Sequence, residues 1–208
     1  MSGKKSIVLL AIVAGALLLP GCFTGGTKQN TRYYMLNAAG GAPRTIKTNT
    51  APAECIPIGV APVVIPEYLD RPQIVTRISP TQINKAAFHR WAEPLTVNFG
   101  RALAENLSRY TCAEKIFFPY VQGNGSLFRV KVEVSQFDGV LGGAVELKVR
   151  WSIFEGNALQ PRLTRLSRYA AAADSSSYED LVLTMCRTLE AFSQEVFDAL
   201  ISLRKASP

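Results

Sequence analysis

The clearest pattern in the chain is a strict alternation of apolar and charged residues in two consecutive segments. Because side chains on a β-strand point alternately to opposite faces, each segment predicts a strand with one buried and one solvated face. Glycines between the segments, Gly139, Gly142 and Gly143, predict an antiparallel hairpin. The apolar positions are Val130, Val132 and Val134 in the first segment and Val145, Leu147, Val149, Trp151 and Ile153 in the second.

The alternation also restricts the register of this hairpin. Both apolar rows lie on one face only if the residue numbers of facing pairs add up to an odd value, because a slip by one residue would turn a charged row toward the core. Glu133 is therefore predicted to face Lys148, or Arg150 in the neighbouring register.

Residues 94–110 are predicted to form the first helix. Pro94 suits its first position, because proline has no backbone N–H to lose there. The helix is expected to finish near Tyr110. Its apolar face repeats every four residues and consists of Leu95, Phe99, Leu103 and Leu107.

The last part of the chain, from about Ser177 to Leu203, is predicted to be a long helix. Two candidate capping boxes mark its start, Ser176 with Glu179 and Ser177 with Asp180. Its single apolar stripe steps by four and three residues and consists of Tyr178, Val182, Met185, Leu189, Phe192, Val196 and Leu200.

Shorter apolar runs predict further strands, and residues 38–54 are predicted to be a loop. Pro57 and Pro62 interrupt one run and indicate strand ends, an edge strand or a bulge. The order of strands, helix, strands and helix predicts an α+β fold, a mixed, largely antiparallel sheet with two main helices packed on it in a single domain. The further strands are expected at residues 33–36, 56–65, 73–78, 83–90 and 162–169.

The amino terminus has the features of a bacterial lipoprotein signal. Lys4 and Lys5 precede an unbroken apolar run over residues 7–19. This run is shorter than the ~20 residues that a membrane span requires, but it suits the apolar core of a signal peptide. It ends in Leu-Pro-Gly-Cys at residues 19–22, which resembles a lipobox. We therefore predict a lipoprotein signal peptide at residues 1–21 and acylation of Cys22.

The residues after Cys22 indicate where the protein is held. Phe23 takes the place where lipoproteins retained at the inner membrane carry aspartate, which favours the periplasmic face of the outer membrane. Residues 22–32 are predicted to be the lipidated N-terminus and tether, and residues 33–208 the folded domain.

Composition and charge narrow the functional classes. The formal net charge is +7, but export removes nucleic acid as a partner. The excess of Lys and Arg then faces lipid phosphates, an acidic protein or simply solvent. His89 is the single histidine, no Cys-x-x-C spacing occurs, and phosphate-binding and hydrolase motifs are absent. We therefore predict no metal, no cofactor and no enzymatic activity.

Three cysteines remain once Cys22 is acylated, an odd number in an oxidising compartment. Cys55 precedes a predicted strand and Cys112 follows the first helix, and an antiparallel helix would bring its end back to the start of that strand. A Cys55–Cys112 disulfide is predicted, with Cys186 as a free buried thiol.

Two segments carry a family resemblance. Tyr-Leu-Asp-Arg-Pro-Gln-Ile-Val at residues 68–75 and Trp-Ala-Glu-Pro-Leu at residues 91–95, together with the lipobox, resemble the ABC-type transport auxiliary lipoproteins of the paraquat-inducible C or YmbA type. The resemblance implies an outer-membrane lipoprotein that partners an inner-membrane complex containing an MCE-domain protein. Such systems are associated with lipid movement between the two membranes.

Two function classes remain open. In the first, the chain is a docking or assembly subunit, which can also form a homo-oligomeric ring. In the second, it is a carrier that holds a lipid or another hydrophobic ligand. A docking subunit would bury the stripe of its last helix against the sheet, whereas a carrier would leave a void behind it.

For docking, the proline-bounded turn and the segment before the first helix supply the candidate contacts. A local ion pair is the alternative for Asp70 and Arg71, and for Trp91 we favour a core position under the helix. The candidate partner interface is Tyr68, Leu69, Asp70, Arg71, Trp91 and Glu93.

Overall fold

The computed structural model describes residues 30–38, 55–123 and 125–206. The chain separates into two compact units, Met1–Asn30 and Thr31–Pro208, and the described helices and strands belong to the second. The predicted signal peptide, Cys22 and nearly all of the predicted loop at residues 38–54 lie outside the described residues.

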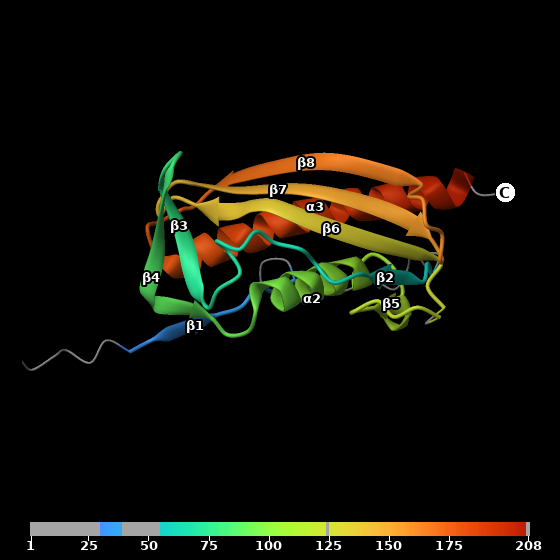
Figure 1. Cartoon of the computed structure of the whole chain (residues 1–208), viewed down its shortest axis with the longest axis horizontal. Helices are drawn as coiled ribbons and strands as arrows, with labels where there is room; N and C mark the ends of the chain where they lie inside the picture. The colour runs from blue at the N-terminus through green and yellow to red at the C-terminus, as the bar shows by residue number, and fades with distance from the viewer. Residues whose placement is uncertain (1–29, 39–54, 124, 207–208) are drawn as a thin grey trace, which may run out of the picture. The chain divides into compact units, whose positions relative to one another are not determined.

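The described residues form two mixed sheets and two α-helices (Figure 1). The order β1-β4-β3 makes a three-stranded sheet, and β5-β2-β6-β7-β8 makes a five-stranded sheet. The strands are β1 (Arg32–Tyr34), β2 (Ile58–Val60), β3 (Gln73–Ser79), β4 (Gln82–Trp91), β5 (Ile116–Phe117), β6 (Phe128–Gly139), β7 (Ala144–Glu155) and β8 (Leu163–Ala172), and the helices are α2 (Leu95–Ser108) and α3 (Tyr178–Ala206), with a 3₁₀ turn η2 (Ala113–Lys115).

The predicted α+β class is confirmed, but the single predicted sheet is in fact two. After β2 the chain stays hydrogen-bonded to β6 as far as Val64 and turns at residues 66–72 before β3, and β1 pairs in parallel with β4. Pro57 and Pro62 flank β2 as strand ends, and β2 lies between β5 and β6 rather than at an edge. β5 and η2 were not predicted from the sequence, because they are too short to produce a periodic pattern.

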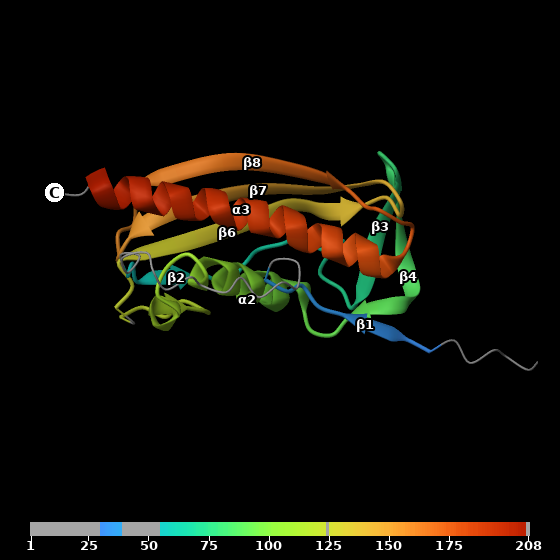
Figure 2. The same ribbon diagram turned by 180° about the vertical axis from the view of Figure 1, so that it is seen from behind.

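Both helices cover one face of the five-stranded sheet (Figure 2). The side chain of Phe192 on α3 packs edge-on against Trp151 of β7, with ring centroids 5.9 Å apart. Phe99 on α2 meets Phe137 of β6 at 5.3 Å. These rings are fully buried, so the predicted apolar stripes form the core. At the start of α3 the Ser177 hydroxyl accepts the Asp180 N–H at 3.1 Å, which selects the second of the two candidate caps.

The β6–β7 hairpin follows the predicted register only in its first half. Glu133 faces Arg150, the neighbouring register of the two alternatives. A register shift between Val134 and Gln136 then inserts one extra residue, and Asp138 comes to face Glu146. Because a bulge exchanges the two faces of a strand, Phe137 points into the core and Asp138 belongs to the outer face. The alternation ends at the bulge, and the sequence analysis therefore did not predict this half.

Cys55 and Cys112, the pair proposed from the sequence, form a disulfide in the structure, with Cα atoms 5.0 Å apart. Beside it the Ile56 N–H donates to the Thr111 hydroxyl at 3.1 Å. The bridge thereby ties the segment before β2 to the end of α2. Cys186 is a free, buried thiol.

Replacing both bridged cysteines, Cys55→Ser with Cys112→Ser, should lower the free energy of unfolding by about 2–4 kcal/mol, because the bridge restricts the unfolded chain. Urea unfolding measures this loss. Reductant should move the wild-type midpoint toward that of the double variant and leave the variant unchanged. A wild-type midpoint that does not change with reductant, together with free thiols detected at both positions, would contradict the bridge.

Candidate functional site: a turn anchored on a buried carboxylate

The turn at residues 66–72 is held by its own backbone and by β4. The N–H groups of Leu69 and Asp70 donate to the Pro66 carbonyl at 2.9 and 3.2 Å, and the Trp91 N–H donates to the Pro72 carbonyl at 2.7 Å. Prolines at both ends restrict the chain further. The turn is therefore ordered before any partner arrives.

The structure divides the six predicted interface residues into three groups. Leu69 and Trp91 are 2% and 5% exposed and belong to the core, the position favoured for Trp91 from the sequence. Tyr68, Arg71 and Glu93 are half-buried, and Asp70 is exposed. Glu93 is occupied within the domain, because it accepts the Asn98 amide at 3.0 Å and an ion pair from Arg101 at 2.9 Å.

Arg71 stabilises the turn and does not pair with Asp70. Its Nε donates to the Tyr68 carbonyl at 2.7 Å, and a terminal nitrogen donates to the Glu67 carbonyl at 3.1 Å. No ion pair joins Arg71 to Asp70 in the described residues, so the local ion pair considered from the sequence does not form. The side chains of Glu67 and Asp70 are left facing solvent.

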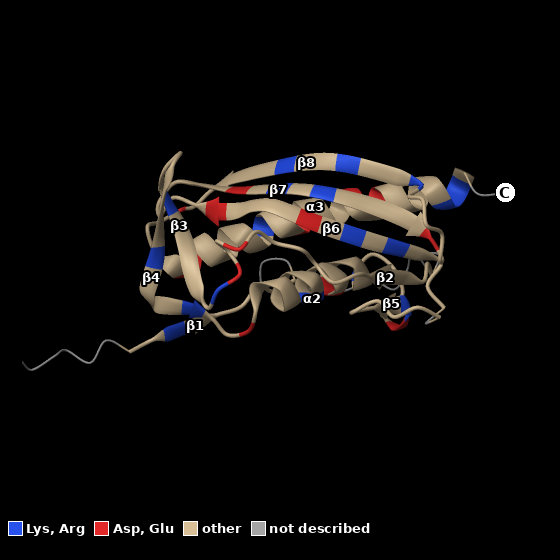
Figure 3. Ribbon diagram, in the orientation of Figure 1, with Lys and Arg blue, Asp and Glu red and all other residues tan. Residues whose placement is uncertain are grey.

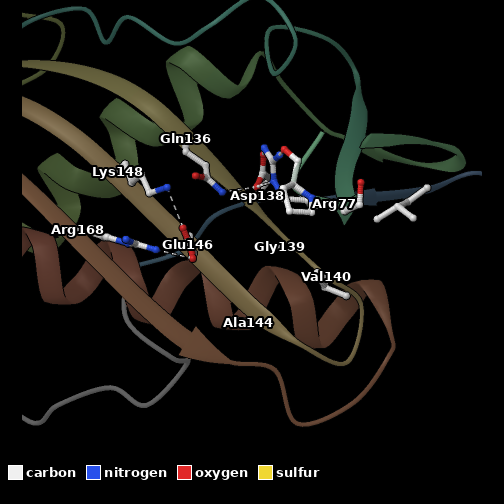
Figure 4. A pocket seen from close by; sticks show the side chains of 12 residues that line it. Arg77, Gln136, Asp138, Gly139, Val140, Ala144, Glu146, Lys148 and Arg168 are labelled. Atoms are coloured by element: carbon white, nitrogen blue, oxygen red, sulfur yellow. Dashed lines mark hydrogen bonds and ion pairs between the residues drawn. The ribbon is translucent and has the colours of Figure 1, made fainter. Parts of the chain in front are cut away.

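The turn rests on Asp138, a fully buried carboxylate near the end of β6 (Figure 4). Tyr68 donates its hydroxyl to Oδ2 at 2.8 Å. From β3, Arg77 donates Nε to Oδ1 at 2.9 Å and a terminal nitrogen to Oδ2 at 2.7 Å. Gln136 adds a bond to Oδ1 at 2.9 Å. One carboxylate thus joins the turn, β3 and the bulged strand.

These contacts determine the charge state of the cluster. Burial alone would raise the pKa of Asp138, but hydrogen bonds from Arg77, Gln136 and Tyr68 outweigh it and hold this pKa below its ordinary value. Burial and the hydrogen bond to Asp138 both raise the pKa of Tyr68. At neutral pH the carboxylate is ionised and the phenol keeps its proton. The cluster is a charged clamp between two sheets.

A groove lined by both charged and apolar side chains lies beside the clamp, between the end of β3 and the outer face of the five-stranded sheet (Figure 4). Glu146 on this face accepts ion pairs from Lys148 at 3.1 Å and Arg168 at 2.9 Å. Charges of both signs occur along β6 and β7, whereas the charged residues of β8 are arginines (Figure 3).

His89 is a packing residue. The Tyr34 hydroxyl hydrogen-bonds to its Nδ1 at 2.7 Å, and its ring stacks on Tyr178 with centroids 3.9 Å apart. Burial and nearby Arg32 lower its pKa, which keeps the imidazole neutral. Within residues 30–38, 55–123 and 125–206, no three His, Cys, Asp or Glu side chains gather as a metal site, and no helix is long and apolar enough to cross a membrane.

The family profile of the ABC-type transport auxiliary lipoprotein component matches residues 34–197. The chain belongs to this family. The match includes both segments that carry the resemblance in the sequence, and it confirms that resemblance. No curated protein matches the chain.

Two solved structures resemble this auxiliary lipoprotein over most of its length. One is the crystal structure of an uncharacterized protein, with 20% sequence identity, 82% of this chain and 99% of that chain covered, and a TM-score of 0.66. The other is protein XCC0632 from Xanthomonas campestris, with 16% identity, coverage of 85% and 99%, and a TM-score of 0.66. At these identities the two structures establish the fold alone.

The cluster of Arg77, Gln136 and Asp138 was not predicted from the sequence. One signal was present, because Asp138 stands directly before Gly139 at the end of an apolar alternation, where a bulge can turn a charged residue away from the core. Its partner Arg77 is distant in sequence, and only the arrangement of the two sheets brings the pair together.

Replacing Asp138 by asparagine should lower the free energy of unfolding by about 2–3 kcal/mol at pH 7, because Arg77 then loses its counter-ion in a mostly buried position. Glu146→Gln is the matched control: its partners are largely exposed, and it should cost less than about 1 kcal/mol. Urea unfolding of both variants measures the difference. Equal losses would contradict the clamp.

Acid should weaken the same contact. The pKa of Asp138 is lower in the folded chain than its ordinary value near 3.8, so ionisation favours folding above that pH. This contribution is lost as the pH falls through the folded pKa. Below about pH 4 the wild type should therefore lose stability more steeply than Asp138→Asn, as thermal unfolding at several pH values would record.

Proposed function

We propose that this auxiliary lipoprotein is a non-enzymatic docking and assembly component of an MCE-type intermembrane lipid transport system. In this proposal Cys22 carries the lipid anchor in the periplasmic face of the outer membrane. The domain contacts an MCE-domain protein of the transport complex. Family membership supports the role in transport, and the fold supports binding rather than carriage.

The observation that carries the docking role is the preformed turn. Its backbone is fixed by Arg71 and by the clamp on Asp138, so little conformational entropy is lost on binding. The exposed carboxylates of Glu67 and Asp70 suit a basic patch on the partner. Leu69 and Trp91 support the turn from the core and are no longer part of the proposed contact surface.

The packing behind α3 favours docking over carriage of a ligand. Leu189 and Phe192 of the apolar stripe are fully buried, and Phe192 lies against Trp151 and Tyr169 of the sheet. Side chains therefore occupy the space that a carrier would keep for a lipid. Native mass measurement after mild extraction tests the alternative, because stoichiometric bound phospholipid would support a carrier.

Self-association into a ring or cluster fits the same role. The nine residues between Cys22 and Arg32 span at most about 30 Å, so anchored copies share a thin layer at the membrane. This confinement raises their effective concentration. Among the described residues β8 is the last strand of the five-stranded sheet, and its outer edge can pair with a second copy.

Replacing Glu67 and Asp70 together by lysine should reduce co-purification with the MCE partner at least about ten-fold, because two attractive charges become repulsive. The melting temperature should stay close to that of the wild type, since both side chains are exposed. The matched control, Glu105→Lys with Glu114→Lys, makes the same change at two other exposed acidic positions. Equal partner recovery from both double variants would exclude the turn as the contact.

Cys22→Ser should abolish acylation and release the protein from the membrane fraction or leave it uncleaved, because the thiol is the acyl acceptor in the proposed anchor. Intact mass of the membrane-extracted wild type should show Cys22 as the modified first residue. An unmodified Cys22 in that fraction would contradict the anchor.

A further inference from the structure

Exposed apolar side chains gather where β1 runs beside the first turns of α3. Tyr33 and Met35 are 65% and 42% exposed, and Leu183 on α3 is 47% exposed. They line one groove of the surface, and we call these three side chains the β1–α3 patch. The groove is completed by Arg32, Tyr34, Asn37, Glu179 and Val182.

The patch has a rigid base. The Ala92 N–H donates to the Tyr34 carbonyl at 2.9 Å, and the Leu36 N–H donates to the Asn98 side chain at 2.6 Å. His89 bridges the two elements, because it bonds to Tyr34 and stacks on Tyr178 at the start of α3. The exposed side chains are therefore held outward by an ordered backbone.

The position of the β1–α3 patch in the chain indicates that it faces the bilayer. Tyr33 follows Cys22 by eleven residues, so an anchored chain keeps Tyr33 within about 40 Å of the bilayer. β1 and the start of α3 lie at one end of the Thr31–Pro208 unit, and the loop between β7 and β8 lies at the other (Figures 1 and 2). The apolar end of the domain is thus the end from which the tether leaves.

The geometry points to a membrane-contact surface: the β1–α3 patch enters the headgroup region of the bilayer that holds Cys22. Tyrosine suits this region because its ring is apolar and its hydroxyl stays hydrated. Exposed Arg32 meets lipid phosphates beside it. Glu179 is the acidic residue of the groove, and it lies in the first turn of α3, where the helix dipole favours a carboxylate. This inference rests on the proposed lipid anchor.

Photo-crosslinking to lipid tests the surface with the mature, full-length lipoprotein. The protein is reconstituted in vesicles of phosphatidylethanolamine with a minor share of phosphatidylglycerol and a trace of phospholipid carrying a headgroup diazirine. Mass spectrometry then maps the crosslinks. We expect them on residues 32–35 and 179–183 and not on the loop around Leu159, which is 91% exposed at the opposite end.

A triple variant and a matched control test the patch itself. Tyr33→Ser, Met35→Ser and Leu183→Ser together should lower the crosslink yield on these segments roughly five-fold, because the apolar area available to the bilayer is lost. The control, Val121→Ser with Leu159→Ser, removes comparably exposed apolar side chains from the other end and should leave the yield unchanged. The wild-type crosslink map remains informative even if the triple variant fails to fold.

The outcomes separate this inference from the proposed function. An acylated protein that crosslinks elsewhere, or whose patch crosslinks to a second copy of the chain, overturns the membrane contact and leaves the anchor standing. A protein that carries no acyl chain on Cys22 overturns both. Lipid crosslinks confined to the two predicted segments support the contact.

Discussion

The domain depends on one buried charge. Asp138 receives hydrogen bonds from Tyr68, Arg77 and Gln136, which come from the turn, the three-stranded sheet and the five-stranded sheet. A carboxylate without these partners would be strongly unfavourable in this place, because burial penalises its charge. The contact therefore specifies how the two sheets pack, because the charge of Asp138 is compensated only when they meet in this arrangement. Apolar packing alone would allow them to shift.

The bulge in β6 is what makes this arrangement possible. Without the extra residue, the alternation that buries Val134 would point Asp138 into the core among the rings of the two helices. With it, Phe137 takes the inward place and meets Phe99, while Asp138 turns toward β3. A single irregularity thus serves the core on one face of the strand and the clamp on the other.

The same features explain which parts of the fold could be predicted from the sequence. The hairpin up to Val134, helix α2 and helix α3 each bury one continuous face, so periodicity alone locates them and predicts the α+β class. The two-residue strand β5 and the division into two sheets depend on contacts between distant segments, which periodicity does not record. For the same reason the turn was identified from the sequence, but the side chains that support it were not. Tyr68 and Leu69 looked like contact residues because their motif is distinctive, whereas Leu69 fills the core and Tyr68 donates to Asp138.

In the proposed docking role, the distinctive motif supports the turn and presents the residues beside it to a partner. Arg71 bonds two carbonyls of the turn, Tyr68 fixes the turn to the sheet, and the carboxylates of Glu67 and Asp70 remain directed to solvent. A short, preformed acidic contact is weak by itself, because exposed ion pairs contribute about 0.2–1 kcal/mol each. Such a contact becomes effective when the chain is confined to a membrane layer and repeated around a complex. The high effective concentration then compensates for the small area that each contact buries. For an anchored auxiliary subunit, a rigid turn of modest affinity favours assembly while still permitting exchange, which a large apolar interface would prevent.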